Sequence, residues 1–210
     1  MTRRRGEPLP KSEWGDGPWQ FEPDELIWTD ERTGLECRII RTMHTGCLCG
    51  YVGIPPTHPY FGWGYSDDIA IDEKTDVEGI EMGKDIGFLD AFIYALDGGN
   101  KHGTIPLGMT LHAHNGITWA GEIPKGEDHR EQWWFGFDCG HCDDIAPAIE
   151  ALLDMIEPPD EIAERRRLFA DNKYRDIEYV RKEVTALAFQ LKQLETRKLL
   201  GALHVQRIGK

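Results

Sequence analysis

The feature that most constrains the fold is a narrow apolar stripe near the C-terminal end of the sequence. Between residue 171 and about residue 200, apolar residues are separated alternately by three and four positions: Ile177, Val180, Val184, Leu187, Leu191 and Leu194. This spacing places them on one side of a long α-helix. Such a helix packs either along a sheet or against the same helix of a second chain. We predict the sheet, and a homodimer through the C-terminal helix is the alternative.

Strand signals come mainly from the first quarter of the chain. Residues 25–29, 35–43 and 47–54 are rich in β-branched and aromatic side chains and are bounded by turn-forming residues. Pro55 and Pro56 end the third of these segments, because proline cannot donate to a sheet ladder. Residues 131–139 alternate aromatic and small or polar residues, which predicts another strand in the interior of the sheet.

A hairpin is predicted over residues 109–122. Asn115 and Gly116 suit the two central positions of a type I′ turn, where both residues need positive φ. In that register His112 and His114 lie on one face, and they pair across the turn with Trp119 and Ile117, respectively.

Three further helices are predicted. Residues 86–96 have helical apolar spacing and are followed by two glycines. Residues 143–156 form a short helix that begins near an aspartate cap, and residues 158–169 form another that begins at a proline pair. Together these elements predict an α+β fold, with an antiparallel sheet of five to six strands packed against the long C-terminal helix.

One domain accounts for the whole length of 210 residues. Residues 1–24 predict a flexible N-terminal arm, which Trp14, Trp19 or Phe21 could pin to the rest. Residues 25–210 form the single α+β domain. No apolar run is long enough to cross a membrane, and the first residues lack the pattern of a signal peptide, so a cytoplasmic protein is expected.

The charge balance limits the partners. The chain has 37 acidic and 24 basic residues, a formal net charge of -13. Such a surface repels a phosphate backbone, which makes nucleic-acid binding an unfavourable function. A small molecule or a host protein is the expected partner. Five cysteines without a disulfide-type spacing indicate free thiols or metal ligands.

The densest group of reactive side chains lies at residues 138–144, where the predicted interior strand ends. It contains Asp138, Cys139, His141, Cys142 and Asp144. Thiolate, imidazole and carboxylate groups at such spacing are ligands for zinc. One four-ligand set draws on Cys47, Cys49, Cys139, His141 and Cys142; a more open set draws on His112, His114, His141 and Asp144. Buried cysteines that act as small apolar residues are the competing interpretation.

Other chemistry is less well supported. Cys139 could be a nucleophile only if a histidine from another element, His114 or His58, reached its sulfur. The aromatic loop at residues 55–66 is either a lid over a flat ligand or a satellite of the core. Arg175 could bind an anion near the sheet. Sequence patterns of P-loops, dinucleotide-binding loops, zinc proteases and serine hydrolases are missing.

Several short segments form a further pattern. They are CGYV at 49–52, His58 with its proline, His114 before a glycine and a threonine, WFGFDCGH at 134–141 with Asp144, YRD at 174–176, and Tyr179 with Val180. Together they resemble a family of uncharacterised phage and prophage proteins. The resemblance spans about residues 45–195. Insertions lie near residues 67–104 and 145–170, and Cys142 is an addition to the motif. The resemblance implies a mobile-element setting without an assigned activity.

The resemblance and the residues lead to similar candidate sites. The resemblance points to Cys49, His58, His114, Cys139, His141 and Asp144. The metal ligands predicted here are Cys49, His114, Cys139, His141 and Asp144, with zinc as the ion. The residues predicted to contact a small ligand are His58, His114, Trp119, His141, Asp144 and Arg175.

Three functions are compatible with these features. The first is an accessory protein that sequesters a small ligand, or inhibits a host protein through its acidic surface. The second is a metal-dependent hydrolase of a nucleotide or phosphoester. The third is a structural or assembly protein, which would form a constitutive oligomer.

Overall fold

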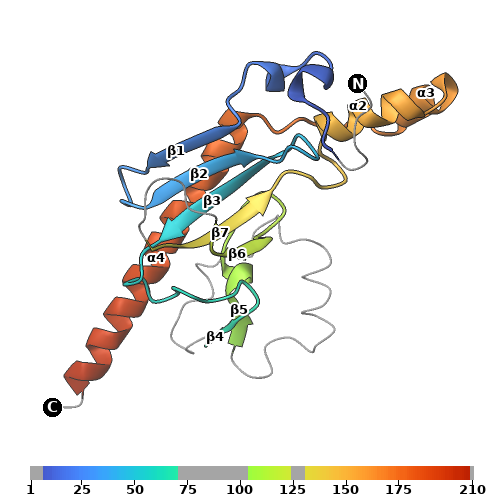
Figure 1. Cartoon of the computed structure of the whole chain (residues 1–210). Coiled ribbons are helices and arrows are strands. Elements are labelled where there is room, and N and C mark those ends of the chain that lie inside the picture. The colour runs from blue at the N-terminus through green and yellow to red at the C-terminus, as the bar shows by residue number, and fades with distance from the viewer. Residues whose placement is uncertain (1–6, 71–103, 124–130, 209–210) are drawn as a thin grey trace.

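The computed structural model of the chain describes residues 7–70, 104–123 and 131–208. At its centre is an antiparallel sheet of five strands in the order β1-β2-β3-β7-β6 (Figure 1). These strands are β1 (Glu25–Thr29), β2 (Glu36–Arg41), β3 (Leu48–Ile54), β6 (Trp119–Gly121) and β7 (Trp133–Asp138). The predicted α+β fold is confirmed, and β7 lies inside the sheet, between β3 and β6.

The long helix α4 (Ile177–Ile208) covers one face of the sheet (Figure 1). Four residues of the predicted stripe, Val180, Val184, Leu187 and Leu191, have no exposed surface. They share one core with Phe135 of β7 and with residues of β2 and β3. Gly50 permits this close packing, because a Cβ at that position would lie 2.5 Å from Cγ2 of Val184. The sheet therefore buries these four residues of the stripe, as predicted.

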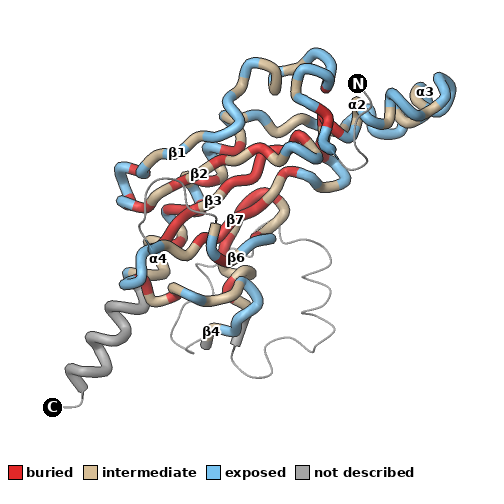
Figure 2. The backbone as a smooth tube through the Cα atoms, viewed as in Figure 1, coloured by how far each residue is buried: buried red, intermediate tan, exposed pale blue. Residues whose placement is uncertain are grey.

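Buried residues concentrate in the central strands and in the face of the helix that meets them (Figure 2). Phe135 and Phe137 of β7 and Val52 of β3 are almost fully buried. Burying each of these side chains stabilises the fold by roughly 1.5–3 kcal/mol. The core thus fixes the end of β7, where the chain turns toward the candidate site.

The N-terminal segment packs against the domain over residues 7–24. It contains the short 3-10 helices η1 (Lys11–Glu13) and η2 (Pro18–Gln20). Trp14 is buried with Ala148, and its indole Nε1 donates to the carbonyl of Leu9 at 2.8 Å. Phe21, by contrast, is 93% exposed. Trp14 is therefore the anchor of the segment predicted as an arm.

The predicted hairpin over residues 109–122 is wrong. Its first half is a 3-10 helix, η4 (Leu107–Thr110), followed by a loop, and β6 pairs with β7 instead. Asn115 and Gly116 do have positive φ, 53° and 92°. However, the Gly116 N–H donates to the Ala113 carbonyl, so the central residues of this turn are His114 and Asn115. The predicted pairing of the two histidines with Trp119 and Ile117 does not occur.

Two further helices extend from the sheet as a hairpin, α2 (Pro147–Ile156) and α3 (Pro159–Leu168) (Figure 1). Both were predicted, but α2 begins after Ala146 without a side-chain cap, so the expected aspartate cap is wrong. A small two-stranded sheet joins β4 (Asp68–Ala70) to β5 (Thr104–Pro106). The helix predicted over residues 86–96 lies outside the described residues. Within the described ranges, no helix has the length and apolarity needed to traverse a bilayer.

Replacing Leu187 with alanine should lower the free energy of unfolding by about 2–4 kcal/mol, because it leaves a cavity between α4 and the sheet. Denaturant unfolding measures this loss, and gel filtration should show an unchanged oligomeric state. Phe189→Ala is the control on the same helix: Phe189 is 41% exposed. An equal loss in both variants would contradict the packing of the stripe.

Candidate metal centre

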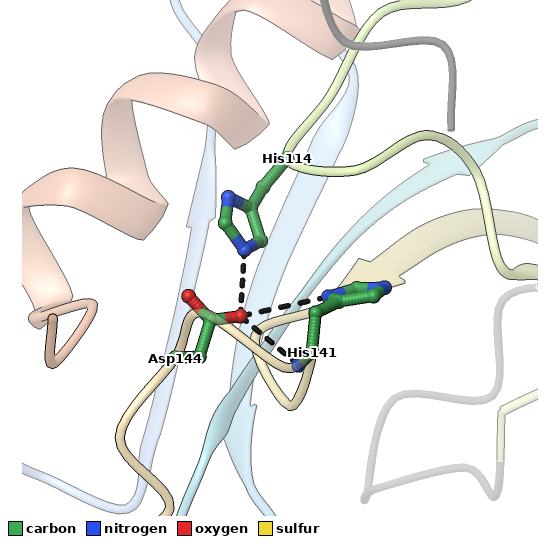
Figure 3. Close-up of side chains that lie close together, drawn as sticks. All are labelled: His114, His141 and Asp144. Carbon is green, nitrogen blue, oxygen red and sulfur yellow. Dashed lines mark hydrogen bonds and ion pairs between the residues drawn. The ribbon is translucent and has the colours of Figure 1, made fainter. Parts of the chain in front are cut away.

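Three side chains converge where β7 ends: His114, His141 and Asp144 (Figure 3). One ligand atom from each lies within 4.8 Å of the other two. His141 and Asp144 belong to the loop that connects β7 to α2, and His114 belongs to the loop after η4. A rigid strand end and a tight turn thus bring together residues about 30 positions apart in the chain.

Asp144 is the centre of this group, and its side chain has no exposed surface. Its Oδ2 accepts from the backbone N–H of His141 at 3.1 Å, and its Oδ1 accepts from Nε of Arg175 at 2.7 Å. Oδ2 also lies 2.8 Å from Nε2 of His114. Burial alone would raise the pKa of Asp144, but the hydrogen bonds from His114, Arg175 and His141 outweigh it and lower the pKa to about 2. Asp144 is therefore a carboxylate at neutral pH.

Both ring nitrogens of His114 have partners. Nδ1 lies 3.0 Å from the hydroxyl of Tyr179 on α4, and Nε2 faces Asp144. The Tyr179 ring also meets the His114 ring edge to face, with centroids 5.6 Å apart. Helix α4 thus fixes the orientation of this imidazole from one side, and Asp144 fixes it from the other.

His141 is held less completely. Its Nδ1 is buried but has no hydrogen-bond partner among the described residues. That atom lies 3.5 Å from Oδ2 of Asp144 and 4.0 Å from Oδ1 of Asp138. The side chain is 28% exposed, so the other part of the ring reaches solvent. A buried polar atom without a partner is rare in folded proteins and often marks a functional site.

The charges around the group favour a cation. Asp138, Asp143 and Asp144 supply three carboxylates, and in the part of the chain that the structure describes Arg175 is the one guanidinium that contacts them, through Asp143 at 3.0 Å and Asp144 at 2.7 Å. With both imidazoles neutral, the formal sum is two negative charges. An anionic ligand would be repelled here, whereas a divalent cation would neutralise the group.

The cysteines do not join this group. Cys47, Cys49 and Cys139 are buried, and among the described residues only His114, His141 and Asp144 meet as potential ligands. Burial raises the pKa of Cys49 to about 12, and burial together with the nearby Asp144 raises that of Cys139 further. These thiols are protonated at neutral pH. Because a bound metal deprotonates a coordinating thiol, it is their separation from the group that favours the predicted imidazole and carboxylate ligands over Cys49 and Cys139. The same protonation argues against Cys139 as a nucleophile.

The remaining predicted ligand-binding residues have separate roles. His58 is buried beside Leu191 of α4, whose carbonyl lies 3.1 Å from its Nε2. Leu191 is twelve residues beyond Tyr179, which is about 18 Å along a helix, so His58 lies far from the centre. The ring of Trp119 lies over Gly121, and the side chain is 45% exposed. Arg175 does not face an open anion site, because it is paired with the aspartates.

Two residues of the site were missed as functional candidates. Arg175 precedes α4 and Tyr179 lies in its first turn, and the guanidinium of Arg175 lies over the Tyr179 ring, 5.1 Å from its centroid. Asp138 was named only as a member of the group of reactive side chains at residues 138–144 and was not assigned a role. Its Oδ2 accepts from the Thr118 hydroxyl and its Oδ1 from the Gly140 N–H, both at 3.0 Å, and its side chain is 42% exposed.

No family model, curated protein or solved structure matches the chain. The resemblance to phage and prophage proteins therefore stays a prediction. The function has to be argued from the site itself.

The low pKa of Asp144 predicts a specific pH dependence of stability. Because the folded-state pKa lies below the ordinary 3.8, the carboxylate stabilises the fold above about pH 4, and this contribution is lost as the pH falls through 2. At neutral pH, Asp144→Asn should lower the free energy of unfolding by about 2 kcal/mol from this source. Unfolding curves measured from pH 7 to pH 2 should show that the difference in free energy of unfolding between Asp144→Asn and the wild type becomes smaller as the pH falls.

Asp143→Asn is the matched control, since Asp143 is the exposed partner of the same Arg175. This variant should keep most of the wild-type pH dependence because the buried carboxylate remains. If the stability difference between Asp144→Asn and the wild type stayed constant down to pH 2, Asp144 would not be the ionised carboxylate described here.

Proposed function

We propose that this protein is a metal-dependent hydrolase with one zinc-type ion held by His114, His141 and Asp144. The observation that carries the proposal is the buried Nδ1 of His141, which has no partner among the described residues and faces the ionised Asp144. A cation between these atoms would satisfy the imidazole nitrogen and the carboxylate together.

The separations of the ligand atoms support this proposal. Two ligands of a tetrahedral zinc ion, each 2.0–2.1 Å from the metal, lie about 3.3 Å apart. Oδ2 of Asp144 is 2.8 Å from Nε2 of His114 and 3.5 Å from Nδ1 of His141. The three ligand atoms lie within 4.8 Å of one another, so the two imidazole nitrogens would have to approach each other by up to about 1.5 Å to complete the geometry. Three protein ligands leave a fourth position for water or substrate, as in catalytic rather than structural zinc sites.

The residues around the ligands have the roles expected of outer-shell partners. With an ion bound, the imidazole proton of His114 would sit on Nδ1 and be donated to the Tyr179 hydroxyl, so that Nε2 would give up its hydrogen bond with Asp144 and offer its lone pair to the ion. Arg175 binds Oδ1 of Asp144 and leaves Oδ2 directed at the two histidines. Both contacts come from the first turn of α4 or the residues just before it, so the helix orients two of the three ligands.

Asp138 is the residue proposed to act as the general base. A divalent ion at such a site lowers the pKa of a water molecule and polarises the bond to be cleaved. Asp138 lies beside His141, is partly exposed, and is held in place by Thr118 and Gly140. Its carboxylate is the group placed to accept the proton of the attacking water. Two histidines and one carboxylate can also bind iron and support oxidative chemistry. The presence of a carboxylate that can act as a base favours hydrolysis instead.

Phosphoesters, including nucleotides, are the proposed substrate class. Apart from Arg175, which is already paired, the site presents carboxylates and imidazoles to an incoming phosphate. The bound ion would supply the positive charge that the phosphate requires.

Metal analysis of protein purified without chelator should find one equivalent of zinc, manganese or iron. His141→Ala should lower the affinity for zinc by at least about tenfold, since it removes one of three ligands. His112→Ala is the control: it removes a neighbouring imidazole of the His114 loop that is not part of the centre. Less than a tenth of an equivalent of metal in the wild type, or equal losses in both variants, would overturn the proposed centre.

Asp138→Asn separates binding from catalysis. It should lower zinc affinity by much less than His141→Ala does, because it removes a nearby charge and not a ligand, and it should lower kcat for phosphoester hydrolysis by about 100-fold or more, the usual effect of removing a general base. Turnover of a panel of nitrophenyl phosphoesters and nucleotides measures this loss. Tight metal binding without turnover of any substrate would instead support the alternative of an accessory protein that sequesters a ligand.

A further inference from the structure

The face of the sheet that points away from α4, called the open face below, carries two aromatic side chains beside β7. Residues paired across neighbouring strands share a face, and Tyr51 of β3 and Trp119 of β6 both pair with Gly136 of β7. Gly50, the neighbour of Tyr51 in β3, packs against α4 on the other face (Figure 1). Tyr51 and Trp119 therefore flank β7 on the open face.

Glycines allow both aromatic rings to lie close to the sheet backbone. A Cβ on Gly136 would lie 2.3 and 2.7 Å from two ring atoms of Tyr51, so a side chain there would displace the ring. A Cβ on Gly121 would lie 3.3–3.6 Å from three indole atoms of Trp119. Trp119 is 45% exposed and Tyr51 is half-buried, so both residues reach solvent. Two rings spread over adjacent strands form an aromatic platform.

The platform is poor in charge compared with the other half of the open face. On β1 and β2 this face carries charged residues, among them Arg38, which binds Glu25. Within β6 and β7 the only charged residue is Asp138. A phosphate would find no cation on these two strands. A planar, uncharged group such as a nucleobase would instead stack on the rings, because every base has a π-face.

Asp138 connects the platform to the metal centre. It lies on the open face, two residues after Gly136, and its Oδ1 is 4.0 Å from Nδ1 of His141. The hydroxyl of Thr118, which precedes Trp119, donates to its Oδ2 at 3.0 Å. The Trp119 ring covers the part of the face that lies two to four residues before Asp138, roughly 7–13 Å along the strand. A base, its sugar and a phosphate together extend over a comparable length.

We propose that the platform of Tyr51 and Trp119 binds the base of a nucleotide whose phosphate is held at the metal centre. This inference rests on the proposed hydrolase function and narrows its substrate class from phosphoesters in general to nucleotides. Trp119 supplies the more exposed stacking surface and is the residue that determines specificity. The formal net charge of -13 disfavours a polynucleotide, so the substrate is a mononucleotide.

NMR titration of the full-length protein with adenosine tests the platform by itself, because a nucleoside carries the base without a phosphate and needs no metal. Adenosine should shift the indole N–H signal of Trp119, which is identified by its absence in Trp119→Phe. The affinity, measured on the adenosine signals, should be similar in Trp119→Phe and at least about tenfold lower in Trp119→Ala, the effect of losing one stacking contact. Ile27→Ala is the matched control, since Ile27 is 50% exposed on the same face but on β1.

Kinetics of the zinc-loaded protein test the connection between the platform and the metal centre. The wild type should have a higher kcat/KM for adenosine monophosphate than for ribose phosphate, which lacks the base. Trp119→Ala should lower the ratio of the two kcat/KM values by about tenfold or more, whereas Trp119→Phe and Ile27→Ala should keep it near the wild-type ratio. Circular dichroism confirms that each variant is folded.

The two measurements separate the failure of this inference from the failure of the proposed function. If adenosine left the Trp119 signal unchanged, or if Trp119→Ala slowed both substrates equally, the inference would be overturned. If adenosine binding depended on Trp119 in a protein that hydrolysed neither substrate, the platform would stand and only the hydrolase proposal would fail.

Discussion

The buried carboxylate of Asp144 is the interaction on which the candidate site depends. Its side chain has no exposed surface, yet it is ionised at neutral pH, so the chain must surround it with donors. Those donors come from three segments: the loop after η4, the loop after β7, and the residues that precede α4. Removing one of them would leave part of the buried charge without compensation, which is costly.

A second buried ionic network holds the beginning of α4 in place. Arg41 has no exposed side-chain surface and binds Glu22, Asp24 and the hydroxyl of Tyr174. Glu22 also accepts from the backbone N–H of Ile177, the first residue of α4. The N-terminal segment therefore fixes the residues on either side of Arg175. Because Arg175 orients Asp144, the packing of that segment is connected to the geometry of the metal centre.

The parts of the fold that could be predicted from the sequence are those in which the pattern of neighbouring residues fits only one secondary structure. The stripe of α4 specifies a buried face and the aromatic run of β7 specifies an interior strand, and both predictions are confirmed, although β7 buries its middle residues on both faces. The hairpin prediction failed for a related reason. Positive φ at Asn115 and Gly116 was read correctly, but a turn signal does not say which strand the following residues pair with. Long-range pairing with β7 decided the position of β6.

The candidate site was predictable in part. His114, His141 and Asp144 were among the proposed ligands because a strand end gathers polar side chains. Cys49 and Cys139 were included because thiolates bind zinc, but the sequence does not reveal that burial keeps these thiols protonated. An aspartate near residue 143 was expected to cap α2, whereas the structure has no side-chain cap there and uses the Asp144 carboxylate to join three segments. Such a role depends on tertiary contacts that no local pattern encodes.

X-ray absorption spectroscopy of the zinc-loaded protein tests the central claim most directly, because it identifies the atoms that bind the metal. The account predicts nitrogen and oxygen neighbours at about 2.0–2.1 Å, with the multiple-scattering signature of two imidazoles. Sulfur neighbours at about 2.3 Å would show that the ion is held by the cysteines instead and would contradict the assignment of His114, His141 and Asp144 as the metal centre.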